Sequence, residues 1–150
     1  MNLYSDSMRV RMKFKKIDKI YFVRIDSGEE IVTVLQKICD ENQIRLGKIS
    51  GIGAVRKATI GFFEMNKKQY HSTVLKGDFE ITSLLGNITT MNDKIYLHVH
   101  INLANEKNQT YGGHLNEAIV SATCEVIIEE FEGEANRRLD KNIGINLLQL

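Results

Sequence analysis

Residues 97–115 read LHVHINLANEKNQTYGGHL, and this stretch carries three of the chain's four histidines. Apolar and hydrogen-bonding residues alternate through positions 95–103, and successive side chains of a strand point to opposite faces. One face of the predicted strand is therefore wholly apolar. The other face carries only hydrogen-bonding side chains: Tyr96, His98, His100 and Asn102. The pattern predicts a strand with one side on the core and a polar side that is available for chemistry.

A polar loop at 105–109 separates this strand from a predicted return strand that includes GGHL at 112–115. In an antiparallel hairpin, one register places His114 opposite His98, and a shift of two residues places it opposite His100. An odd register would put His114 on the apolar face, unless a bulge at Gly112-Gly113 intervenes. The two glycines also leave room for a neighbouring strand or a ligand to approach.

Three histidines on one face predict a metal site. Neutral imidazole is the commonest protein ligand of zinc, and zinc–nitrogen bonds of about 2.0–2.1 Å require rings that converge on one point. We therefore expect His98, His100 and His114 to hold a divalent metal, most naturally zinc. Three protein ligands leave a fourth position open, as in catalytic zinc sites. Candidates to orient a water molecule there are Asn102, Tyr96, Glu80 and Glu117.

The alternative is that the three histidines form hydrogen bonds at a polar or subunit surface without a metal. His71 stands apart from them and is expected to be an ordinary surface histidine.

The remaining chain predicts one helix and several strands. Apolar residues recur at helical spacing from Ile31 to Cys39, which predicts an amphipathic helix at about 28–42 that is capped by Ser27 and Glu30. Strands are expected at 21–25, at 122–131, and between 44 and 103, where turns separate them at 66–68, 76–78 and 91–94, and where a turn or bulge is expected at 86–87. A helical turn at 116–121 and a last strand near 143–147 are weaker features. Gly51 and Gly53 favour a bulge over a phosphate-binding loop.

Composition bounds the class of protein. At 150 residues, with 43% hydrophobic and 26% charged residues, the chain fits a single domain, 1–150, of the α+β kind. We expect a mainly antiparallel sheet with one helix. No apolar run is long enough to cross a membrane and no signal peptide is recognisable, so a cytoplasmic location is expected. Cys39 and Cys124 are far apart, which favours reduced core thiols.

The net charge of +1 predicts no global attraction to nucleic acid. Basic residues nevertheless alternate with apolar ones near the N-terminus, at Arg9, Arg11, Lys13 and Lys15. A solvated edge strand protected by charge is the favoured interpretation, and a phosphate-contacting stripe is the alternative. Six glutamates and no basic residue occupy positions 117–134.

An ordered set of motifs resembles the plants and prokaryotes conserved (PPC) domain family. These motifs are GIGAV at 51–55, FEI at 79–81 with Leu84, GNI at 86–88, LHVH at 97–100, GGHL at 112–115 and EVII at 125–128. The resemblance extends over about residues 20–131. It implies an α/β-type sandwich around an antiparallel sheet and a homotrimer. It also implies that His98, His100 and His114 form a metal-capable cluster near a subunit interface.

Plant members of that family join the domain to AT-hooks, and the family is described as DNA-binding on that account. An AT-hook needs a Gly-Arg-Pro core, and this chain contains no proline. DNA is therefore a weakly supported partner. The sequence predicts a trimeric metal-binding PPC-domain protein with a DNA-binding or regulatory role. The alternatives are a hydrolase-like zinc enzyme that acts on a small substrate through water at the open position, and a pure trimerisation module.

Overall fold

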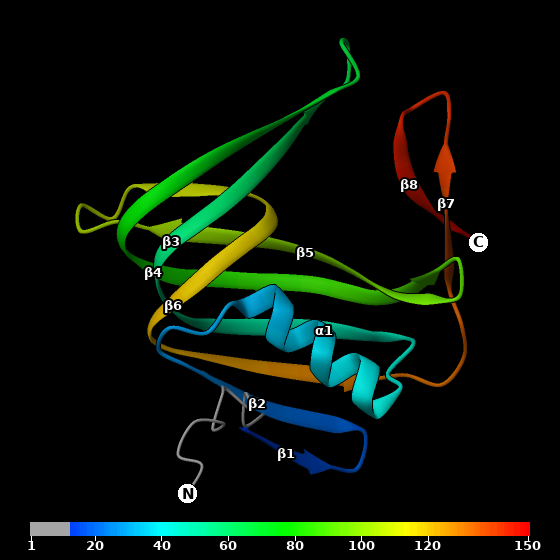
Figure 1. Ribbon diagram of the computed structural model, residues 1–150, viewed down its shortest axis with the longest axis horizontal. Coiled ribbons are helices and arrows are strands. Elements are labelled where there is room, and N and C mark those ends of the chain that lie inside the picture. Colours follow the sequence, from blue (N-terminus) through cyan, green and yellow to red (C-terminus); the bar gives the residue numbers. More distant parts are fainter. Residues whose placement is uncertain (1–12) are drawn as a thin grey trace, which may run out of the picture.

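The computed structural model describes residues 13–150, so Arg9 and Arg11 lie outside the described part of the chain. One helix and eight strands make up this part (Figure 1). In chain order they are β1 (Lys13–Ile17), β2 (Ile20–Asp26), α1 (Ile31–Asn42), β3 (Gly47–Glu64), β4 (Gln69–Met91), β5 (Lys94–Ala104), β6 (Thr110–Glu130), β7 (Asn136–Asp140) and β8 (Ile145–Gln149).

All eight strands belong to one sheet, in the order β1-β2-β6-β3-β4-β7-β8. Strand β5 lies off this path and pairs with both β4 and β6, while β3 also pairs with both of them. Strands β3, β4, β5 and β6 therefore form a closed ring of pairings, and this closure brings the end of β5 beside the start of β6. The tips of β3 and β4 project from the body as a long hairpin (Figure 1).

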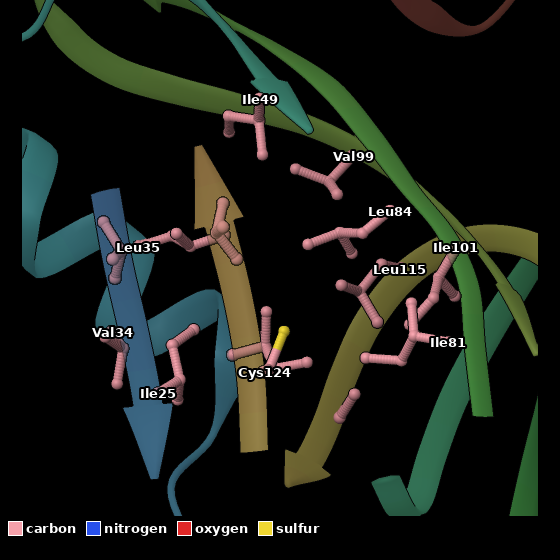
Figure 2. Close-up of a cluster of buried hydrophobic side chains, with 14 of the residues drawn as sticks. Ile25, Val34, Leu35, Ile49, Ile81, Leu84, Val99, Ile101, Leu115 and Cys124 are labelled. Carbon is pink, nitrogen blue, oxygen red and sulfur yellow. The ribbon is translucent and has the colours of Figure 1, made fainter. Parts of the chain in front are cut away.

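The core lies inside this ring and beneath the helix. Helix α1 buries its apolar stripe, predicted from the spacing, and the inward residues of β2–β6 complete a continuous cluster (Figure 2). The apolar face predicted for β5 is confirmed, since Val99, Ile101 and Leu103 are buried while Ile95 and Leu97 pack at the edge of the cluster. Cys39 and Cys124 are buried free thiols, as expected.

Helix α1 begins later than predicted, and Ser27 does not cap it. Glu30 is the N-cap, and its carboxylate accepts hydrogen bonds from the backbone N–H groups of Val32 and Thr33 at 3.0 and 2.7 Å. The same carboxylate accepts from the N–H of Ala118 at 3.0 Å, which ties the helix start to β6. The capping-box pattern predicted the wrong cap, because the contact of Glu30 with Ala118 of β6, which favours Glu30 as the cap, cannot be recognised in the sequence.

The middle strands are longer than predicted. Residues 69–91 form one strand, so the turn expected at 76–78 is wrong, and so is the turn or bulge expected at 86–87, where the register is regular. Gly86 serves a close approach instead, because a Cβ there would lie 2.4 Å from the carbonyl oxygen of His98. The helical turn expected at 116–121 is part of β6. The bulge at Gly51–Gly53 is confirmed by a shift in the β3–β4 register.

Nearly all strand pairs are antiparallel, and a single bridge between Thr90 and Asn136 makes the sheet mixed. The expected sheet-dominated fold with one helix is confirmed, although one helix on one sheet is a simpler arrangement than the expected sandwich. The C-terminal strand predicted near 143–147 is present as β8, together with the unpredicted β7. Within residues 13–150, no helix has the length and apolar character needed to span a membrane.

Candidate metal centre

Strand register places two different rows of side chains on the two faces of the sheet. One row joins Val23, Val126, Gly51, Leu84 and Ile101, and its four apolar side chains belong to the core. The adjacent row faces outward, away from the core, and runs in register across five strands: Phe22, Ile127, Ser50, Leu85, His100 and His114. On the outer face, exposed apolar residues therefore lie in the same row as His100 and His114.

The three predicted histidines are brought together on this outer face. His100 is the direct cross-strand partner of His114, which is one of the two registers expected from the sequence, and no bulge at Gly112-Gly113 is needed. The ring centroids of His98, His100 and His114 are 5.1–5.5 Å apart. One potential ligand nitrogen from each ring lies within 4.8 Å of the other two. The cluster is therefore compact enough to share one ion.

Glycines let the strands approach closely around His114. Gly61 of β3 is the register partner of His114 on the side away from β5. A Cβ at Gly113 would lie 2.6 Å from the carbonyl oxygen of Gly61, so glycine is required for this approach. Tyr70 crosses over Gly61, stacks edge-on against the ring of His114 with centroids 6.3 Å apart, and donates a hydrogen bond to Asn116. The close approach of β3 and the ring of Tyr70 from β4 thus fix the position of His114.

A residue outside the predicted site contacts the cluster. Arg137 of β7 is only 8% exposed, and its Nη2 lies 3.3 Å from Nδ1 of His98. A guanidinium can only donate, so Nδ1 accepts and the hydrogen of a neutral His98 ring belongs on Nε2. A metal bound through Nε2 would need the opposite tautomer and a shift of Arg137. No pattern in the sequence points to this residue, because β7 is a short strand without apolar alternation.

The environment keeps the imidazoles neutral, as metal ligation requires. Burial, the charge of Arg137 and the neighbouring histidines lower the pKa of His98 to about 4. Burial and the nearby His100 also lower the pKa of His114. At neutral pH both rings therefore present unprotonated nitrogens, which are the form that binds metals.

The two glutamates expected to orient water are not part of the cluster, whereas Asn102 lies on the same face of β5 as His100, two residues along the strand. Glu117 pairs with Lys57 at 2.9 Å, and Glu80 lies opposite Ala104 at the far end of β5. Tyr96 lies under the guanidinium of Arg137. Among residues 13–150 the histidine group includes no carboxylate or thiol, so its potential protein ligands are the three imidazoles. His71 is exposed and bonds to Glu64, in agreement with a surface role.

Lys13 and Lys15, the two of these basic N-terminal residues that the structure describes, lie on an edge strand, as the favoured interpretation expects, since β1 pairs only with β2 in the described part of the chain. Lys13 pairs with Asp26, and Lys16 pairs with Glu130 at 3.4 Å. Lys16 alternates with Lys13 and Lys15 along β1, so its pair with Glu130 lies on the other side of the strand, and the pair of Lys13 with Asp26 is the one that neutralises part of the basic face among the described residues.

The fold and the histidine cluster agree with a comparison against known families. The model of the Plants and Prokaryotes Conserved domain matches residues 12–132. The chain belongs to this family. The three histidines lie within the matched residues of this PPC domain, whereas Arg137 and the hairpin β7–β8 lie beyond them.

Solved structures of similar proteins share the fold. A candidate DNA-binding protein from Bacteroides thetaiotaomicron is 34% identical, with a TM-score of 0.90 over 92% of this chain and 96% of that one. A metal-containing protein from Archaeoglobus fulgidus is 35% identical, with a TM-score of 0.83 over 95% of this chain and 100% of that one. A plant- and prokaryote-conserved protein from Pyrococcus horikoshii is 29% identical, with a TM-score of 0.77, and covers 92% of this chain and 95% of its own length.

A curated relative is a much longer protein. The bifunctional protein GlmU of Synechococcus sp. (strain JA-2-3B'a(2-13)) is 25% identical over 114 residues, which are 75% of this chain but 17% of that protein. This chain therefore spans about a fifth of the length of the curated relatives it matches.

Proposed function

We propose that this PPC-domain protein binds a divalent metal ion, zinc in the first place, through His98, His100 and His114. The convergence of three imidazoles within 4.8 Å carries the proposal. Tetrahedral zinc with bonds of about 2.0–2.1 Å separates its nitrogen ligands by roughly 3.3 Å, so small rotations of the rings, together with the shift of Arg137 away from His98, would complete the site. The metal-containing relative from Archaeoglobus fulgidus adds support.

Zinc suits this donor set better than calcium or magnesium do. Those ions prefer oxygen ligands, whereas neutral imidazole nitrogen is a normal ligand of zinc and of the later transition metals. Three protein ligands also leave room for an exogenous fourth ligand. The site thus fits a binding or regulatory role in which a small molecule or a macromolecule completes the coordination.

Metal content and titration test this proposal. Purified protein should contain close to one zinc per chain, or should take up one zinc per chain after treatment with a chelator. His98→Ala and His100→Ala should each weaken zinc binding at least about tenfold, since each removes a ligand. His71→Ala, which removes an exposed histidine outside the cluster, is the matched control and should bind zinc normally. Protein that contains no metal and rejects added zinc would refute the proposal.

Self-association as a homotrimer is the second part of the proposal, and the outer sheet face supports it. Exposed apolar residues line an open concavity of about 1030 Å³ on this face. Phe22, Ile52, Leu85 and Ile127 are between 38% and 59% exposed. A contiguous apolar surface of this kind is typical of an interaction site. Because the outer row of side chains includes His100, a trimer that buries this row in its interface would have the metal centre near that interface.

The mass of the protein in solution tests the assembly. Sedimentation equilibrium should give three chain masses for the natural sequence. Ile52→Glu places a charge in the apolar surface and should shift the protein toward the monomer. Val74→Glu changes a similarly exposed residue on the projecting hairpin and should leave the trimer intact. A monomeric natural protein, or an equal effect of both substitutions, would refute this assembly.

DNA binding is a second candidate role, favoured by the description of the relative from Bacteroides thetaiotaomicron. It predicts retention on duplex DNA that weakens with salt, because released counterions drive such binding. Charge reversal at Arg9, Arg11 and Lys13 should reduce the retention. No retention even at low salt would remove this role.

A zinc-dependent hydrolase is the alternative, and the open fourth ligand position favours it. Hydrolysis of an activated ester by zinc-loaded protein should then be lost in His100→Ala and kept in His71→Ala. Activity that is indifferent to His100→Ala would reject a metal mechanism.

A further inference from the structure

Arg137 is a buried cation held entirely by neutral groups. Its Nε donates to Thr89 Oγ1 at 2.9 Å, and its Nη1 donates to the carbonyl oxygen of Asn146 at 3.1 Å. Its Nη2 donates to Asn87 Oδ1 at 2.9 Å, and the guanidinium carbon lies 5.2 Å from the centre of the Tyr96 ring. These contacts fix the group firmly, and none of them carries a negative charge.

No carboxylate within residues 13–150 lies within ion-pair distance of Arg137. Other basic residues of this chain show the usual behaviour: Arg45, which is more exposed, has both Asp93 and Glu134 within 4.0 Å. A buried charge is costly unless an opposite charge accompanies it, so buried arginines are normally paired. Within residues 13–150, Arg137 therefore lacks the negatively charged partner that a buried guanidinium normally has.

The position of Arg137 shows where that counter-charge would lie. The guanidinium contacts His98, a member of the histidine cluster, at 3.3 Å. The cluster itself holds no acidic side chain among the residues from 13 onward. Three neutral imidazoles would leave a bound divalent ion with its full double charge, and Arg137 adds one more beside it. This accumulation of positive charge, partly shielded from solvent, favours an anion at the remaining ligand position.

We propose that Arg137 provides the counter-charge for a small carboxylate anion that binds at the open position of a metal held by His98, His100 and His114. This inference rests on the proposed metal site. A carboxylate fits because its oxygen is an ordinary zinc ligand and its single negative charge balances one guanidinium. When His98 binds the metal, Arg137 has to give up its contact with Nδ1 of His98, while its bonds to Thr89, Asn146 and Asn87 keep the guanidinium beside the cluster, so it acts through its electric field, as a positioning and charge-selecting residue.

The proposal makes opposite predictions for the metal and for the anion. A positive charge beside the site opposes binding of a bare cation and favours binding of an anion to the loaded site. Removing the charge of Arg137 should therefore leave the affinity for the metal unchanged or higher and should weaken the binding of the anion. A purely structural role of Arg137 would weaken both together, because the cluster would lose its support.

Visible spectroscopy of the cobalt-loaded protein separates these cases, since ligands that enter the fourth position change the cobalt absorption bands. Acetate serves as the anionic probe and imidazole as the neutral one. Arg137→Gln, which keeps a side chain able to form hydrogen bonds, should weaken acetate binding about tenfold and leave imidazole binding unchanged. Arg137→Lys keeps the charge and should retain acetate affinity within about threefold. Arg138→Gln removes an exposed positive charge from the next residue and is the matched control.

Equal losses for acetate and imidazole, or unchanged acetate affinity in Arg137→Gln, would overturn the inference. If Arg137→Gln does not fold, Arg137→Lys decides alone, and a tenfold loss of acetate affinity there would contradict a role of charge. Failure of the natural protein to bind cobalt or zinc would instead refute the proposed metal site.

Discussion

His100 and His114 are direct cross-strand partners, and Gly61 flanks His114 on the opposite side. The metal-capable cluster therefore depends on the ring of pairings that β3, β4, β5 and β6 complete. Both histidine strands are anchored to the core, because the alternate residues of β5 and β6 are buried in it. The site is a rigid feature of the scaffold, which makes it sensitive to how closely the strands approach.

Gly113→Ala tests that dependence. The added methyl group would lie 2.6 Å from the backbone oxygen of Gly61, so β6 has to move away from β3. We expect a loss of about 1–3 kcal/mol in the free energy of unfolding, measured with urea, together with weaker zinc binding. Gly112→Ala is the control: its closest contacts, Asn102 Oδ1 at 3.1 Å and the backbone oxygen of Ile101 at 3.2 Å, are much looser than 2.6 Å, so the effect should be smaller. Equal effects of the two substitutions would contradict the account.

The start of helix α1 gives a second prediction. Glu30→Ala removes the acceptor for three backbone N–H groups, those of Val32, Thr33 and Ala118. The loss should be about 1–3 kcal/mol in the free energy of unfolding, since a cap and a tertiary hydrogen bond disappear together. Ser27→Ala, at the residue that the sequence pattern favours as the cap, should change stability by less than about 0.5 kcal/mol. A larger effect at Ser27 would show that the helix begins elsewhere.

Acid should destabilise the metal-free protein through His98. Its pKa is about 4 when folded, against an ordinary value of 6.5, so the unfolded chain binds more protons between these values. The contribution is complete above about pH 6.5 and is lost as the pH falls toward 4. His114 acts in the same direction, because its pKa is also lowered. Urea unfolding at successive pH values should show this decline.

His98→Gln should flatten that pH profile, and His71→Gln, at the exposed histidine, should leave it unchanged. A profile that keeps its slope without His98 would assign the acid sensitivity to other groups.

The two cysteines should be inert in the folded protein. Burial raises the pKa of both Cys39 and Cys124 to about 12, so almost no reactive thiolate forms at neutral pH. A colourimetric disulfide reagent should label neither residue in native buffer and both in denaturant. Rapid labelling of the native protein would show that the core beneath α1 opens.

The alternation in β5 is enough to predict the histidine cluster from the amino-acid sequence. A strand period of two separates Val99 and Ile101 from His98 and His100 without ambiguity, and the hairpin rule limits where His114 can lie. The sequence could not decide whether His114 lies opposite His98 or opposite His100, because the register of β5 with β6 depends on how β6 also pairs with β3.

Arg137 and the continuity of β4 could not be predicted for a different reason. A glycine in a strand pattern can mark a turn, or it can make room for a neighbouring strand, and the sequence alone does not distinguish the two. Gly77 and Gly86 therefore led to wrong predictions of turns within β4. Arg137 and Arg138 are the same residue type at neighbouring positions. Only the docking of the β7–β8 hairpin buries Arg137 and leaves Arg138 exposed. Long-range contacts of this kind leave no local pattern.

Anomalous diffraction from crystals grown with zinc tests the central claim most directly. Data collected on both sides of the zinc absorption edge should show one strong anomalous peak between the rings of His98, His100 and His114, about 2.0–2.1 Å from a nitrogen of each. Clear density for the three rings with no anomalous peak between them, in crystals that contain zinc, would contradict the account.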